Sequence, residues 1–111
     1  MDNENKTWLY DILQSIIEIE SYYENQEMVF QEYLNDLKTK RAIERNIEII
    51  GEAVNRIIKK SPEFKIENAH KIIGARNRII HGYDTVSDEL VWSIVVNHLP
   101  KLKEEIETKL D

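Results

Sequence analysis

The sequence predicts an all-α protein, an up-and-down bundle of four main helices with one short extra helix. Three observations support this fold class. Apolar residues recur at three- and four-residue steps through most of the chain, as on one face of a helix. The 111 residues include only 3 Gly and 2 Pro, too few turn residues for a sheet of many strands. The connections are short, so residues 1–111 are expected to form a single domain.

The first helix is expected over about residues 6–23. Its apolar positions advance by three or four residues, which stacks them on one face. They are Leu9, Ile12, Leu13, Ile16, Ile19 and Tyr23. A further apolar group between Met28 and Leu37 has the spacing of a short helix that ends before Lys40.

The second long helix is expected over residues 39–60. Its stripe consists of Ile43, Ile47, Ile50, Val54 and Ile57. Gly51 lies inside this helix, where glycine costs about 1 kcal/mol relative to alanine. A close crossing with another helix is the expected compensation, because glycine lets two backbones approach. The helix should end at Ser61, because the residue before Pro62 is steered out of the helical region.

The third helix is expected to follow Asn68, which has the side chain of an N-cap residue. Its inner face is traced by Ala69, Ile72, Ile73, Arg76, Ile79 and Ile80. Gly82 should end it, because glycine takes the left-handed conformation at little cost.

The fourth helix is expected over residues 88–110, with Thr85 or Ser87 as its cap. Pro100 lies inside its apolar pattern and removes one backbone donor. A kink is therefore predicted near Asn97.

Charge is distributed unevenly along the chain. The net charge of -6 argues at first against a nucleic-acid partner. Residues 38–78, however, hold 11 Lys and Arg against 5 Asp and Glu, whereas the rest holds 4 against 16. This asymmetry indicates one face for phosphates and another for solvent or a basic partner. The alternative is that the asymmetry reflects only the uneven charge that helix surfaces often carry, without a role in binding.

Several protein classes are disfavoured by composition. Cysteine is absent, which excludes a thiolate nucleophile and a zinc–thiolate site and fits the cytoplasm. No apolar run approaches the roughly 20 residues of a membrane span. The acidic first residues lack the plan of a signal peptide.

The groups best suited to phosphate chemistry lie together between Ala75 and Tyr83. Arginine presents a permanently charged fork that matches two phosphate oxygens. Histidine can act as a base or an acid near neutrality. Cleaving RNA requires a base for the 2′-hydroxyl, positive charge for the anionic phosphorane and an acid for the leaving oxygen. Arginine and histidine supply all three, so neither a metal nor a cofactor is required.

Helical geometry limits how these groups can meet. Asn77 and Arg78 share a face with His81, being four and three residues away. Arg76 is five residues from His81, which places the two about 140° apart around the helix. Either Arg76 reaches round with its long side chain, or a second copy of the chain completes the site. The mismatch therefore predicts a homodimer.

The spacing Arg76, four residues, His81, one residue, Tyr83 resembles the signature of the HEPN superfamily of nucleases and nucleotide-binding proteins. Residues 46–53 and 76–83 together resemble the HepT-like toxins. Val91-Trp92 and Leu99-Pro100 also fit that group, and the likeness covers nearly the whole chain.

The resemblance implies a HEPN-like, all-helical endoribonuclease that is toxic to its own cell and acts as a homodimer. Arg76 and His81 would be the catalytic pair and Asn77 their assistant, with Arg78 and Tyr83 binding RNA. It further implies a minimal nucleotidyltransferase antitoxin, which transfers AMP from ATP to Tyr83 and can form a larger complex with the toxin. The added bulk and negative charge would block RNA.

Other interpretations remain open. The chain is alternatively a non-catalytic nucleotide- or RNA-binding module, or a purely structural dimerisation bundle. Arg76 can instead pair with Glu48 or Glu52, and His81 and Tyr83 can be structural.

The remaining histidines and lysines have less specific interpretations. His70 lies on nearly the same stripe as His81, where it either extends an RNA-contacting edge or, as favoured, is simply solvated. His98 is expected to be structural. Four lysines are surface residues first and phosphate contacts second; they are Lys59, Lys60, Lys65 and Lys71.

Overall fold

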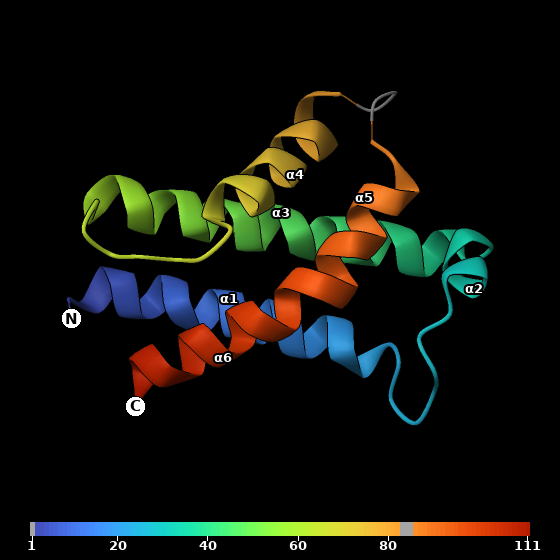
Figure 1. Cartoon of the computed structure of the whole chain (residues 1–111), viewed down its shortest axis with the longest axis horizontal. Coiled ribbons are helices and arrows are strands. Elements are labelled where there is room, and N and C mark those ends of the chain that lie inside the picture. Colours follow the sequence, from blue (N-terminus) through green and yellow to red (C-terminus); the bar gives the residue numbers. More distant parts are fainter. Residues whose placement is uncertain (1, 83–85) are drawn as a thin grey trace.

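The computed structural model describes residues 2–82 and 86–111, and within them all regular structure is helical (Figure 1). The all-α bundle predicted from the sequence is therefore confirmed. The elements are α1 (Asn3–Ser21), α2 (Phe30–Leu34), α3 (Leu37–Lys60), α4 (Ala69–His81), α5 (Asp88–Ser93), the π-helical segment η2 (Ile94–His98) and α6 (Leu99–Leu110).

The longest helix, α3, organises the bundle. It packs along α1 and is crossed by α4, while α6 packs on α1 (Figure 1). The predicted apolar stripes meet between these helices. The largest fully buried side chains are Tyr33, Leu9, Ile12, Ile16, Ile43, Ile47, Ile50, Ile57, Ile72, Ile94, Leu102 and Ile106. No helix among the described residues is long and apolar enough to cross a membrane.

Two helices begin earlier than their apolar stripes indicate, because an aspartate caps each of them. Asp2 accepts a hydrogen bond of 2.8 Å from the backbone N–H of Asn5 and starts α1. Asp36 accepts bonds from the hydroxyl of Thr39 at 2.7 Å and from its backbone N–H at 3.0 Å. These bonds lower the pKa of Asp36. Carboxylates near a helix N-terminus are stabilised by the same donors.

The α3–α4 crossing occurs where the sequence predicted it. Gly51 is buried, and a Cβ added there would lie 3.4 Å from the carbonyl oxygen of Ile72 on α4. Glycine at this position therefore allows the two helix backbones to approach. The crossing brings α4, which carries Arg76, against α3.

Both ends of α4 lie where expected, but the capping interaction at each end differs from the prediction. Asn68 has φ 61° and makes no capping hydrogen bond with its side chain. Gly82 ends the helix and its N–H donates to the carbonyl of Arg78 at 2.9 Å. Its φ is -139°, so the predicted left-handed conformation is wrong. The backbone at Gly82 therefore has a conformation that requires no positive φ.

The last helix is interrupted by a π-helical turn at the place where the sequence predicted a kink. The segment η2 includes Asn97, and the N–H of Leu99 bonds to the carbonyl of Ile94, five residues back. Pro100 follows in the first turn of α6. A widened turn accommodates the missing proline donor. Ser87 caps α5 by accepting from the N–H of Leu90 at 3.0 Å, while the alternative cap Thr85 lies outside the described residues.

Candidate functional site

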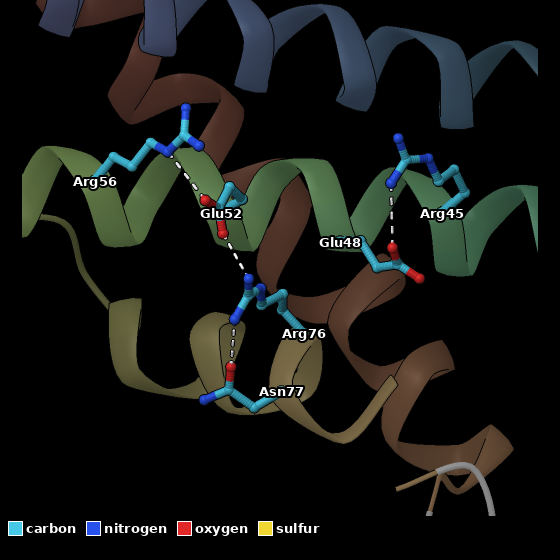
Figure 2. A network of polar contacts seen from close by, with 6 residues as sticks. All are labelled: Arg45, Glu48, Glu52, Arg56, Arg76 and Asn77. Atoms are coloured by element: carbon cyan, nitrogen blue, oxygen red, sulfur yellow. Dashed lines mark hydrogen bonds and ion pairs between the residues drawn. The ribbon is translucent and has the colours of Figure 1, made fainter. Parts of the chain in front are cut away.

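Arg76 projects from α4 towards α3 and is only partly exposed. One terminal nitrogen, Nη2, donates to Oε2 of Glu52 at 2.6 Å, and Nη1 donates to Oδ1 of Asn77 at 2.8 Å (Figure 2). The pairing with Glu52, an alternative left open by the sequence, is thus present. Glu48 instead pairs with Arg45 at 3.1 Å.

Glu52 holds two guanidinium groups at once. Its Oε1 accepts from Nε of Arg56 at 2.9 Å, while its Oε2 accepts from Arg76 (Figure 2). Such charge-assisted bonds fix geometry better than neutral ones. One carboxylate shared by two arginines leaves this three-residue network with a net charge of about +1. The Nε of Arg76 is buried and has no hydrogen-bond partner in the described part of the chain.

A cavity of about 280 Å³ lies over this network, between α1, α3 and α4. Its charged lining is balanced, with three arginines and three carboxylates. The lining residues are Trp8, Asp11, Arg45, Glu48, Ile49, Glu52, Ala53, Arg56, Arg76 and Ile80. Polar side chains from three helices therefore surround the guanidinium of Arg76.

His81 is the last residue of α4 and its side chain is exposed. It does not line the cavity that contains Arg76. Both residues belong to one regular helix, so the angular separation of about 140° expected from their spacing applies. The guanidinium of Arg76 is held by Glu52 and Asn77 rather than turned round the helix. A single chain therefore does not bring the two groups into this cavity.

Arg78 lies on the other flank of α4 and lines a different cavity, of about 390 Å³. This cavity also contains His98, whose pKa is lowered by burial and by the nearby positive charges of Lys71 and Lys101. The sequence interpretation of His98 as structural missed this placement, since only the folding of η2 against α4 reveals it. Tyr83, the expected modification site, lies outside the described residues.

No group of three or more His, Cys, Asp or Glu side chains within residues 2–82 and 86–111 is arranged to hold a metal ion.

Comparisons with known proteins agree on one family. The family model described as "Ribonuclease HepT-like" matches residues 12–108. The chain is 35% identical over 106 residues to "Putative RNase MJ0127" of Methanocaldococcus jannaschii, covering 92% of this chain and 84% of that protein. It is 32% identical over 108 residues to "Probable ribonuclease HepT" of Thermococcus cleftensis, covering 96% of each. No solved structure gives a significant match.

Proposed function

The chain belongs to the HepT-like ribonuclease family, and from this premise we propose that it is a toxin that cleaves RNA without a metal ion. The observation that carries the proposal is the fixed guanidinium of Arg76. Glu52 and Asn77 hold it in place, five residues before His81 on the same helix. An oriented, permanently charged group is what an anionic phosphorane requires.

The proposed reaction is a transesterification. His81 accepts the proton of an RNA 2′-hydroxyl, and the 2′-oxygen forms a bond to the adjacent phosphorus. Arg76 stabilises the crowded anion through its N–H donors. The bond from phosphorus to the 5′-oxygen then breaks, and the imidazolium returns its proton to that oxygen. The products are a 2′,3′-cyclic phosphate and a 5′-hydroxyl.

A homodimer would complete the site. In one chain Arg76 and His81 lie about 140° apart around α4, so a two-fold arrangement that faces one α4 with another supplies the missing neighbour. Arg78 and Tyr83 would then contact RNA along the shared cleft. Asn77, whose amide oxygen accepts from Arg76, would assist by orienting that guanidinium.

The proposed regulator is a minimal nucleotidyltransferase antitoxin acting in the same cytoplasm. The phenolic oxygen of Tyr83 attacks the α-phosphorus of ATP, pyrophosphate leaves and the phenolic proton passes to solvent. Tyr83 is two residues from His81, so the attached AMP would bring negative charge to the edge of the site. Repulsion of RNA phosphates follows.

The test is cleavage of RNA by highly purified protein in EDTA, with the product ends identified by mass spectrometry. We expect cyclic phosphate ends, and we expect His81→Ala to abolish cleavage while circular dichroism shows an unchanged fold. Equal cleavage by wild type and a folded His81→Ala variant would remove His81 from the mechanism.

One observation favours a second candidate, a non-catalytic RNA- or nucleotide-binding module. Both terminal nitrogens of Arg76 are engaged, which suits a structural role for the arginine. This candidate predicts RNA binding that weakens with salt and with Arg76→Ala, and no turnover. If wild-type protein cleaves RNA and the Arg76→Ala variant does not, the non-catalytic candidate is excluded.

A further inference from the structure

The cavity on the far flank of α4 differs in charge from the cavity around Arg76. It lies between α4 and the α5–η2 segment and has a volume of about 390 Å³. Four of its lining residues carry or can take positive charge, namely His70, Lys71, Arg78 and His98. The described lining includes no carboxylate, although the chain as a whole has a net charge of -6.

Within residues 2–82 and 86–111, the positive groups of this cavity are also not paired with carboxylates. Arg45, Arg56 and Arg76 each pair with a glutamate in the other cavity. Lys71 and Arg78, by contrast, form no ion pair with any carboxylate in the described part of the chain. Positive charge that is not paired with a carboxylate of the described residues, gathered in a concave site, attracts anions.

Helical spacing places two residues that carry or can take positive charge on one wall of the cavity. His70, Gly74 and Arg78 follow one another at steps of four along α4, so they share one face. Arg78 is three residues from His81, and the same face therefore leads towards the proposed catalytic histidine. A phosphodiester chain that passes His81 can continue along this wall.

The wall that faces α4 carries a buried imidazole nitrogen, and the α4 wall leaves free space at Gly74. The Nδ1 atom of His98 is buried and has no hydrogen-bond partner among residues 2–82 and 86–111. A Cβ added at Gly74 would meet no heavy atom within 4 Å. The π-helical turn η2 supplies both Ile94 and His98 to this wall, and such turns recur at functional sites.

We propose that the cavity between α4 and η2 binds an RNA phosphate away from the scissile bond, through Lys71, Arg78 and the two histidines. That the phosphate belongs to RNA rests on the proposed function, whereas anion binding does not. The site extends the contact with RNA beyond the reacting nucleotides and places Arg78 in a defined subsite.

Gly74 allows a direct test, because side chains can be added there without a clash. Gly74→Glu places a carboxylate in the cavity, and Gly74→Gln is the matched neutral control of equal size. Fluorescence anisotropy with a 2′-O-methyl oligoribonucleotide, which cannot be cleaved, measures affinity at several salt concentrations. We expect Gly74→Glu to weaken binding roughly tenfold at low salt and to lower the slope of log affinity against log salt by about 0.7, the value for one single-strand phosphate.

Two further measurements test the subsite, one with a Lys71 variant and one by NMR. Lys71→Gln, at an exposed position, should weaken binding several-fold and lower the same slope. Titration with inorganic phosphate or AMP should shift the imidazole NMR signals of His70 and His98, and the oligonucleotide should do so at lower concentration. Equal RNA affinity of Gly74→Glu and Gly74→Gln, both folded by circular dichroism, would overturn the proposal. If the protein fails to cleave RNA and Gly74→Glu still weakens RNA binding, the catalytic proposal fails and the subsite stands.

Discussion

Gly51 on α3 and Arg76 on α4 are in direct contact at the helix crossing. A Cβ added at Gly51 would lie 2.9 Å from Cγ of Arg76 and closer still to its Cβ. The absence of a side chain at Gly51 therefore determines how near the base of Arg76 can come to α3. The next residue, Glu52, binds the guanidinium of the same arginine. Two consecutive residues of α3 thus position one side chain of α4.

Gly51→Ala should destabilise the protein although alanine favours helices. The new methyl group must displace Arg76 or separate the helices, and overpacking of this kind costs about 1–3 kcal/mol. Chemical denaturation should show a lower midpoint. RNA cleavage measured below the transition should fall as well, because Arg76 moves.

Gly74→Ala is the matched control, since Gly74 also lies inside a helix but has free space around it. There the higher helix propensity of alanine should stabilise the protein by up to about 1 kcal/mol. Stabilisation of similar size by both substitutions would contradict a tight contact at Gly51.

Glu52→Gln should reduce the rate constant of cleavage by about tenfold or more, because small errors in the position of a catalytic group are costly. The amide cannot hold both Arg56 and Arg76 by charge. Glu48→Gln serves as the control, since Glu48 pairs with Arg45 and not with Arg76. Single-turnover kinetics separate this effect from RNA binding. A loss of equal size in both variants would show that general charge, and not the position of Arg76, is at work.

His98 should make stability depend on pH below neutrality. Burial and then the charges of Lys71 and Lys101 lower its pKa in the folded chain from the ordinary value of 6.5. The unfolded chain therefore binds this proton more readily. The contribution of neutral His98 to the free energy of unfolding is complete above pH 6.5 and is lost as pH falls through the lowered pKa.

His98→Gln tests this link, because glutamine does not titrate. The free energy of unfolding, measured from pH 7.5 down to about pH 5, should fall less steeply in the variant than in the wild type. Parallel curves would show that burial of His98 does not penalise its protonation.

Tyr83 should be the acceptor of AMP. Intact-mass measurement after incubation with a minimal nucleotidyltransferase antitoxin and ATP should show additions of AMP in the wild type and none in Tyr83→Phe. The modified protein should also lose RNA cleavage, because a phosphate group next to the site repels RNA. Additions of AMP that persist in Tyr83→Phe would assign the modification to another residue.

The buried face of each long helix could be predicted from the sequence, because apolar residues spaced three and four apart lie on one face of a helix. The stripe from Ile43 to Ile57 predicted the inner face of α3, and Gly51 predicted a crossing. The starts of α1 and α3 were placed late because the caps Asp2 and Asp36 stand outside the apolar pattern. The left-handed conformation predicted for Gly82 was wrong, because glycine permits that conformation without requiring it.

The site was less accessible to sequence reasoning than the fold. Glu48 and Glu52 lie one turn apart on α3, and only the register of the crossing selects Glu52 as the partner of Arg76. The cavity that joins His98 to Arg78 depends on how η2 packs against α4, residues far apart in the chain. The spacing of Arg76 and His81 did show that one helix cannot align them.

Complementation between two inactive variants tests the composite site most directly. Arg76→Ala and His81→Ala proteins are each purified, mixed in equal amounts, allowed to exchange subunits and assayed on RNA in EDTA. If Arg76 of one subunit works with His81 of the other, half of the dimers are mixed and one of their two sites is intact. The account predicts recovery of roughly a quarter of wild-type cleavage. No recovery, with subunit exchange verified by native mass spectrometry, would contradict it.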